Sequence, residues 1–431
     1  MKKVLFKSLK AKLEKVEDFK KEKNNPNFPR WQKLIIFTII LAIFASAGFL
    51  FYKQAEGIYY HHFDTSYIPP HEIKYPGQYQ KTYTSDLSGH IESALRTDIP
   101  AYTITKPLYR FVFWHLGGTF GIAILLAAFV VGAIWATKKL LDYYYDEKHE
   151  FKTWIWAILL NFNIAIYLPW ITQYFNTGVQ EPNEWHNSTY TIMKFFALLA
   201  MLLYFKIEKN YLKHIDAKKY IVFTALLLIV NAVKPTFIIA FAPAMLLFFI
   251  IDFFKNIKNK KAIGNIIIFG CSVLISLSVL IYQSKVLYGT GENSDGSGIA
   301  VSVLTALKMY HPYPLISILQ SAAFPLFILF TNLKTVLSDR KHSFVLAMNA
   351  VALPLYLFFV ETGPRAGDGN FDWSYTFTLM MAFISSVSIL RALPKKKTNV
   401  VYLAVAYLLL AAHIVSGLIY YGVLLSGGAY N

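Results

Sequence analysis

Residues 34–52 read LIIFTIILAIFASAGFLFY, a run of 19 residues without a charged side chain. A helix rises about 1.5 Å per residue, so this run spans about 28 Å, close to the roughly 30 Å hydrocarbon core of a bilayer. Similar apolar runs lie at 116–137, 152–171, 189–205, 220–233, 236–254, 262–284, 316–332, 343–360, 375–391 and 399–424. The sequence therefore predicts an all-α polytopic membrane protein with about 11 transmembrane helices.

The composition of the whole chain agrees with this class. Of its 431 residues, 55% are hydrophobic and only 16% are charged, whereas soluble domains carry roughly 25% charged residues. Mean hydropathy is +0.41. These values exclude a soluble globule and a disordered chain. Cys271 is the single cysteine, which excludes an intrachain disulfide and a metal site built from cysteines.

The net charge of +17 reflects membrane topology and does not indicate nucleic-acid binding. Lysine and arginine concentrate in alternate loops, which lie at 138–152, 206–219, 255–261, 334–342 and 391–398. Cytoplasmic loops of membrane proteins carry such an excess of Lys and Arg. We therefore expect a multi-pass protein with a cytoplasmic N-terminus and an external C-terminus. The remaining loops are then external.

We expect a cytoplasmic basic tail at 1–33 and a single transmembrane domain at 34–431. The tail carries eleven Lys/Arg against four Asp/Glu. It is either a solvated tail or an amphipathic helix on the anionic leaflet, since its apolar residues recur at helical spacing. The outer loops at 53–115, 172–188, 285–315 and 361–374 form the predicted active face. The loop at 285–315 is a mobile lid or simply a flexible segment, because it contains GTGENSDGSG.

The first outer loop contains a candidate base. Residues from Ser85 or Asp86 fit a short helix on which Asp86 and His90, four residues apart, share a face. Asp86 either caps this helix or acts chemically. The stretch KPLYR follows, where Lys106 and Tyr109 form either a snorkelling interfacial belt or the lip of a lipid-facing site.

Three further outer segments mix polar, charged and aromatic side chains. The segment QEPNEWHNSTY contains Glu181, His186 and Asn187, which suit hydrogen bonds to a polyhydroxylated or phosphorylated ligand. Lys234 precedes Pro235 between two apolar runs, where it either snorkels or faces an anion in a cavity. The segment ETGPRAGDGNFDW offers an arginine fork for phosphate, and amide and aromatic groups for a sugar. Its candidate residues are Glu361, Arg365, Asn370 and Trp373.

These segments together resemble the GT-C superfamily of membrane glycosyltransferases, in particular bacterial members that act on cell-surface polysaccharides. The resemblance lies in SDLSGHI, KPLY, EWHNSTY, VKPTF and ETGPRAGDGNFDW. It implies many membrane spans, a long first outer loop with surface helices, and a polyprenyl-phosphate-linked sugar as donor. It also implies a glycan or lipid-linked acceptor at the outer face of the bacterial cytoplasmic membrane. Members often carry paired acids in the first loop, whereas here only Asp86 is prominent. The other acids of the loop are more distant: Asp64, Glu72, Glu92 and Asp98. Metal dependence is left open.

The expected reaction is glycosyl transfer, with inversion implied by the resemblance. Asp86 takes the proton of the acceptor hydroxyl. Lys234 and Arg365 stabilise the leaving lipid phosphate. The sugar is held by His90, Glu181, His186, Asn187, Asn370 and Trp373. Two alternatives are a polysaccharide polymerase or ligase acting on undecaprenyl-diphosphate oligosaccharides, and a transporter or flippase. The chain contains neither GxxxxGK nor GxGxxG, so no soluble cofactor is expected.

Overall fold

The computed structural model describes residues 29–62, 82–83, 85–96, 101–145, 150–172, 174–177, 179, 185–286, 298–311, 313–363, 370–393 and 399–428. In this part of the chain almost all regular structure is helical. The helices are α2 (Arg30–His62), α3 (Leu87–Leu95), α4 (Thr105–His115), α5 (Gly118–Tyr144), α6 (Glu150–Leu160), α7 (Ser188–Glu208), α8 (Ala217–Val233), α9 (Thr236–Lys255), α10 (Lys260–Lys285), α11 (Thr305–Tyr310), α12 (Pro314–Thr331), α13 (Leu333–Ser338), α14 (Arg340–Phe358), α15 (Asp372–Ala392) and α16 (Val400–Leu425).

The protein is a helical multi-pass membrane protein. Among the described residues, nine helices are long and apolar enough to cross a bilayer: α2, α5, α7, α9, α10, α12, α14, α15 and α16. The predicted span at 220–233 corresponds to α8, which has 17 residues. The predicted span at 152–171 is wrong as a continuous helix, because α6 has 11 residues and ends at Leu160. The prediction of about 11 spans is therefore confirmed only as a polytopic helical fold.

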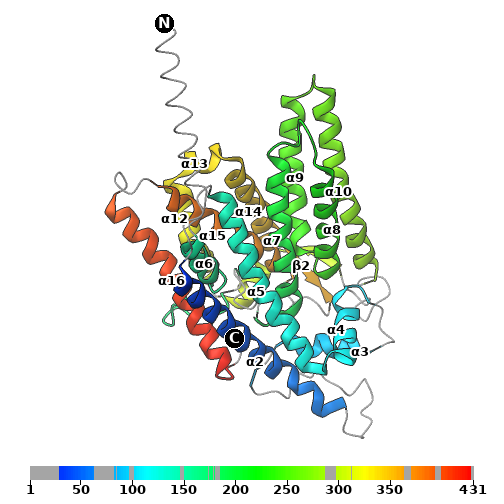
Figure 1. Cartoon of the computed structure of the whole chain (residues 1–431), viewed down its shortest axis with the longest axis vertical. Coiled ribbons are helices and arrows are strands. Elements are labelled where there is room, and N and C mark those ends of the chain that lie inside the picture. The colour runs from blue at the N-terminus through cyan, green and yellow to red at the C-terminus, as the bar shows by residue number, and fades with distance from the viewer. Residues whose placement is uncertain are drawn as a thin grey trace.

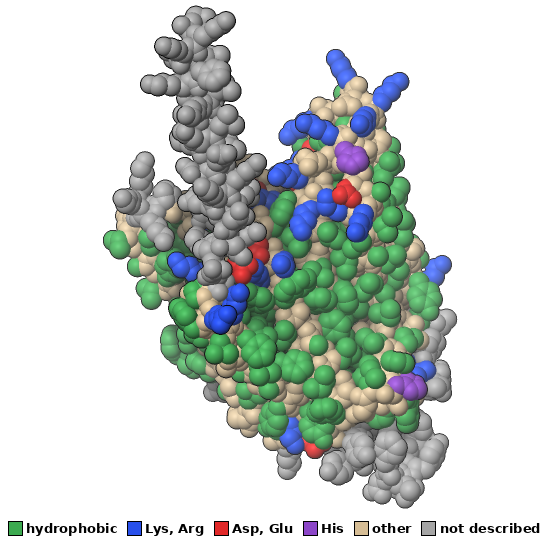
Figure 2. Space-filling view, viewed as in Figure 1, with side chains coloured by type: hydrophobic (Ala, Val, Ile, Leu, Met, Phe, Trp, Pro, Cys, Tyr) green, Lys and Arg blue, Asp and Glu red, His purple; other side chains and the backbone are tan. Residues whose placement is uncertain are grey.

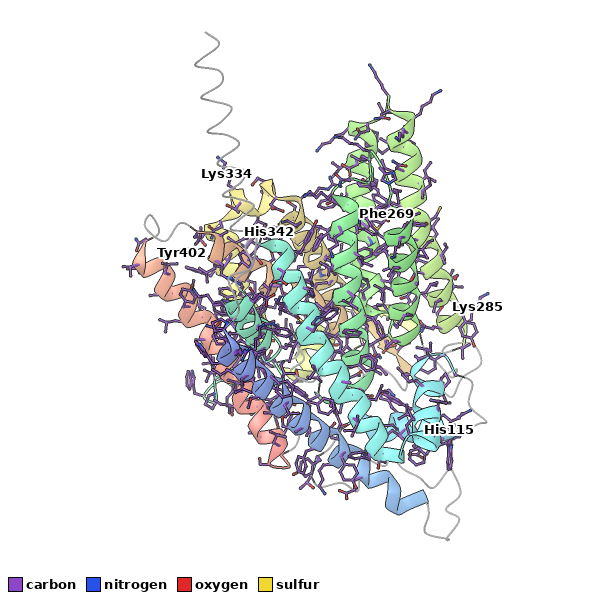
Figure 3. All side chains as sticks on the ribbon, in the orientation of Figure 1. His115, Phe269, Lys285, Lys334, His342 and Tyr402 are labelled. Carbon is purple, nitrogen blue, oxygen red and sulfur yellow. The ribbon has the colours of Figure 1, made fainter. Side chains whose placement is uncertain are left out.

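The bundle has two chemically different ends (Figure 1). At one end, which we call the basic end, α5, α7 and α9 finish and α8, α10 and α14 begin. Lys334 and His342 lie there, whereas His115 lies at the opposite end (Figure 3). We call that opposite end the sheet end, since it carries α3, α4 and a small β-sheet. Figure 2 shows a belt of hydrophobic side chains across the molecule, with most visible Lys and Arg side chains above it at the basic end.

The small sheet pairs two loops that are distant in the sequence. Strand β1 (Gly298–Val301) runs antiparallel to β2 (Phe359–Thr362), with Ile299 opposite Glu361. The described part of the predicted flexible loop 285–315 is therefore a strand followed by α11, and the stretch 287–297 lies outside the described residues. The sheet joins the loop before α12 to the loop before α15.

Helices α7 and α15 form the centre of the bundle. Neighbouring helices enclose most of each. Of the 18 residues that form the apolar stretch of each helix, 72% are buried in α7 and 94% in α15, compared with 22% in α10. The buried face of α15 carries small polar side chains such as Ser374, Thr378 and Ser385. Small residues of this kind let membrane helices approach closely. Because both helices are packed on all sides, their first turns hold side chains at the sheet end in defined positions.

The chain leaves helical geometry after α6 and continues as an extended segment within the bundle. The Ile166 N–H donates to the Gln320 carbonyl (2.9 Å), and the Gln320 side-chain amide donates to the Ile166 carbonyl (3.0 Å). The buried His413 ring lies 2.6 Å from the Ile164 carbonyl. Backbone that is not helical persists at membrane depth only where protein groups satisfy it. Side chains of α12 and α16 meet that condition here.

Gly417 on α16 allows this extended segment to pack. A methyl group at position 417 would overlap the carbonyl oxygen of Phe162. We expect Gly417→Ala to destabilise the fold by at least 1–3 kcal/mol, roughly the cost of overpacking a core. Thermal unfolding of the purified protein in detergent measures this. Gly422→Ala on the same helix meets no atom within 4 Å and should unfold no earlier than the wild type. Equal unfolding temperatures for both variants would contradict the packing described.

Candidate active site

Asp86 lies at the start of α3, at the sheet end of the bundle. It occupies the N-cap position, but its side chain makes no capping hydrogen bond. The Oγ of Ser85 accepts from the Leu87 N–H instead, at 2.9 Å. The alternative in which the Asp86 carboxylate only caps the helix is therefore wrong. The side chain is 47% exposed and turns towards α7.

Two residues that precede α7 contact the Asp86 carboxylate. The Nε2 atom of His186 lies 2.8 Å from Oδ1 of Asp86. The amide Nδ2 of Asn187 lies 3.5 Å from Oδ2, a much weaker contact. Asn187 is itself the N-cap of α7, and its Oδ1 accepts from the Tyr190 N–H at 2.9 Å. The helix cap thereby orients the amide, and Oδ2 stays the more available oxygen of Asp86.

The surroundings of Asp86 favour its ionised form. Desolvation at this site raises the pKa of the carboxyl group, but the hydrogen bond and charge of His186, with the charges of His90 and Lys234, outweigh it. The net result is a pKa lowered to about 2. The carboxylate therefore stays charged as the pH falls from 7 to well below 4. Its pairing stabilises the fold above the ordinary pKa of about 4, and this contribution is lost as the pH falls towards 2.

Removing His186 should make the charge of Asp86 sensitive to mild acid. In His186→Leu the hydrogen bond and the electrostatic interaction that lower the pKa of Asp86 are lost, so this pKa rises. If Asp86 must be ionised for activity, the acid limb of the kcat/KM profile of His186→Leu lies at higher pH than that of the wild type. The activity of membranes that contain each protein, measured from pH 4 to 8, tests this. His115→Leu, which removes an exposed imidazole on α4, should leave the profile unchanged. If the acid limb of His186→Leu does not shift, ionisation of Asp86 does not control the rate.

Lys234 approaches the same region from the turn between α8 and α9. It is the C-cap residue of α8, and its side chain is buried. Its Nζ lies 5.0 Å from the ring centroid of Trp373 on the first turn of α15. That ring in turn packs against Tyr190 of α7, with centroids 4.8 Å apart. A cation over an aromatic face at this distance is attracted to the ring, so Trp373 contributes to the position of the ammonium group.

Polar contacts hold the turn that carries Lys234. The Asn231 side chain donates to the Ser276 carbonyl of α10 at 2.6 Å, and Gln283 donates to the Asn231 carbonyl at 2.8 Å. At the start of α9, the Thr236 carbonyl accepts from the Ser374 hydroxyl of α15 at 2.7 Å. Pro235 is the N-cap residue of α9 and prevents α8 from continuing. The lysine therefore sits on a turn fixed by both α10 and α15.

Glu361 and Asn370 form a separate part of the predicted site. Glu361 is a buried residue of β2, and its Oε2 accepts a short hydrogen bond from the Asn370 side chain. The pair joins the two ends of the loop between β2 and α15, just before Trp373. Their predicted contact with a sugar stays a prediction, while the structure gives them a role in holding the loop.

The two residues predicted to form either a snorkelling belt or the lip of a lipid-facing site are buried. Lys106 and Tyr109 both lie on the inward face of α4, and the Tyr109 hydroxyl lies beside Ser188 at the start of α7. The physical reason is that α4 packs against α3 and α5, so apolar Phe111 and Trp114 form its exposed face instead. Arg110, the last residue of the predicted KPLYR segment, holds the end of α3. It donates to the carbonyls of Ala94 (2.7 Å) and Arg96 (2.6 Å) at the end of α3.

A largely buried ionic cluster at the basic end was not predicted from the sequence, where the basic loops were interpreted only as topology signals. Arg340 at the start of α14 pairs with Asp252 of α9 and Glu208 of α7. Tyr211 donates to the same aspartate. The signal in the sequence was Asp252 within the apolar stretch FFIIDFFK, since a buried acid requires a partner. The cluster joins α7, α9 and α14, and α7 begins directly after His186 and Asn187, which contact Asp86.

The described residues therefore bring together Asp86, His90, His186, Asn187, Lys234 and Trp373, from α3, α7, the α8–α9 turn and α15. Glu181 and Arg365 lie outside the described residues, so their positions stay predictions. No group of three or more His, Cys, Asp or Glu side chains suited to a metal ion occurs in the described part of the chain.

Comparison of the chain with protein-family models and with curated proteins found no match.

Proposed function

We propose that this protein is a glycosyltransferase that moves a sugar from a polyprenyl-phosphate donor to a glycan or lipid-linked acceptor at the outer face of a bacterial cytoplasmic membrane. One observation carries the proposal. An ionised carboxylate, Asp86, lies at one end of a membrane bundle, close enough to a buried lysine, Lys234, for that charge to lower its pKa. A proton acceptor beside a cation suits displacement of an anionic leaving group by a hydroxyl.

Asp86 is the base in this proposal. The oxygen Oδ1 is held by His186, whereas among the described residues Oδ2 has only the long contact to Asn187. The acceptor hydroxyl oxygen attacks the anomeric carbon, the bond from that carbon to the phosphate oxygen breaks, and the hydroxyl proton moves to Oδ2. A carboxylate with a low pKa is a weak base. It takes the proton late, once the forming bond has made the hydroxyl strongly acidic.

Lys234 stabilises the phosphate as it leaves. Its ammonium group is a compact point charge, which suits a phosphate monoester. Burial strengthens the interaction, because charges attract more strongly where water is excluded. Arg365, which lies outside the described residues, is the second predicted cation in this role.

A groove within the bundle suits the lipid chain of the donor. It has a volume of about 220 Å³ and is lined by apolar residues of α12, α14 and α15, including Leu326, Leu353 and Leu379. Its lining includes Tyr375, two residues beyond Trp373 on α15, and reaches His342 at the basic end. A lipid whose phosphate lies at Lys234 could place its hydrocarbon chain along this groove, where apolar contact replaces contact with other lipids.

The test of the proposal is transfer of radiolabelled sugar by the purified protein in liposomes. Donors would be a sugar on polyprenyl monophosphate and an oligosaccharide on polyprenyl diphosphate. Covalent transfer from the monophosphate supports the proposal. Transfer only from the diphosphate identifies the alternative, a polysaccharide polymerase or ligase. Movement of the labelled lipid across the bilayer with no covalent product identifies a flippase and overturns the proposal.

A further inference from the structure

Three lysines from different helices converge at the basic end of the bundle. Lys139 lies near the end of α5, Lys206 near the end of α7 and Lys219 in the first turn of α8. Helix α7 contacts both α5 and α8. Lys206 is close enough to Lys139 and Lys219 for both charges to act on it. Blue side chains gather above the hydrophobic belt in this part of Figure 2.

In the described part of the chain, one lysine of this trio pairs with an acid and two do not. Lys219 pairs with Asp216 at 2.7 Å. Among the described residues, no carboxylate is recorded within pairing distance of Lys139 or Lys206. The neighbouring Lys138 shows the contrast, since it pairs with both Asp142 (2.7 Å) and Glu150 (3.7 Å). Like charges that converge repel one another, so the trio is a place where an anion would be stabilised.

Exposed apolar side chains lie on the same helices as two of these lysines. Trp135, one turn before Lys139 on α5, is 41% exposed, and the lysine lies 5.7 Å from its ring centroid. Ile221 and Val222 follow Lys219 on α8 and are also exposed. Tryptophan concentrates at the boundary between hydrocarbon and head groups. A free anion would contact only the lysines, whereas an anionic lipid would contact both the lysines and the exposed apolar side chains.

We propose that Lys139, Lys206 and Lys219 bind the head group of an anionic phospholipid in the leaflet at the basic end, with its acyl chain against Trp135, Ile221 and Val222. Basic pockets between membrane helices recognise such head groups. This site is distinct from the proposed donor site, because the 21 residues of α7 separate the two by about 30 Å. It does not depend on the proposed transferase activity.

The experiment measures lipid binding by the delipidated full-length protein in detergent. Phosphatidylglycerol, phosphatidylcholine and inorganic phosphate are titrated separately. We expect phosphatidylglycerol to bind at least tenfold more tightly than the other two. The variant K139Q/K206Q/K219Q should lose at least tenfold of that affinity. The matched variant K258Q/K260Q/K261Q removes three exposed lysines from the tip between α9 and α10, and it should bind within about twofold of the wild type.

A third variant, K139R/K206R/K219R, retains the charges and guards against misfolding as an explanation. It should bind phosphatidylglycerol nearly as well as the wild type. Equal losses in the two glutamine variants would show attraction to the whole basic end, and would overturn the site. Inorganic phosphate binding as tightly as phosphatidylglycerol would also overturn it, because the lipid chain would then contribute nothing.

Discussion

The Asp86→Asn variant is expected to lose about 10²–10⁴-fold in the rate of sugar transfer, the range typical of a general base. Asparagine keeps the size of the side chain and can still accept a hydrogen bond from His186. It cannot take the acceptor proton as the new glycosidic bond forms. The measurement is initial transfer rate with saturating donor and acceptor, in liposomes that contain equal amounts of folded protein.

Glu92→Gln provides the matched control for Asp86. It removes a carboxylate from the same short helix, six residues further on, and should retain nearly full activity. Near-normal activity in Asp86→Asn would remove Asp86 as the base. A similar loss in both variants would point to disturbance of α3 and would remove the specific assignment to Asp86.

Lys234→Gln should reduce transfer by about 10²–10³-fold, the usual cost of removing one group that stabilises developing negative charge. The ammonium group is buried against Trp373, so water compensates poorly for its loss. The effect should fall mainly on kcat, because charge on the phosphate oxygen grows as its bond to the sugar breaks. Initial rates over a range of donor concentration separate kcat from KM.

Lys285→Gln is the control for Lys234. Lys285 is an exposed lysine at the end of α10, labelled in Figure 3, and its loss should change the rate less than twofold. If the dependence of the transfer rate on donor concentration is the same in Lys234→Gln as in the wild type, Lys234 only stabilises the turn. Comparable losses in both lysine variants would indicate long-range attraction of the donor and not a contact with it.

The helical membrane fold could be predicted because each transmembrane helix is a local property of its sequence. A run such as 34–52 has no charged side chain that would have to be kept out of lipid, so length and hydropathy decide its structure. The same reasoning failed at 152–171, where most of the run is apolar but the helix ends at Leu160. There the chain leaves the helix because Gln320 and His413, far along the sequence, satisfy its backbone. Hydropathy carries no information about such partners.

For the candidate site, the sequence by itself determined which side chains were available and on which loops they lay. Asp86, His186 and Lys234 stood out because charges near membrane depth are costly to retain. Only the tertiary structure decided that His186 contacts Asp86, that Trp373 lies over Lys234, and that Lys106 and Tyr109 are buried. These contacts join α3, α7, α8 and α15, and they arise from packing between helices distant in the chain. Local periodicity places a side chain on a face of its own helix, whereas its partner is set by the helix that packs against that face.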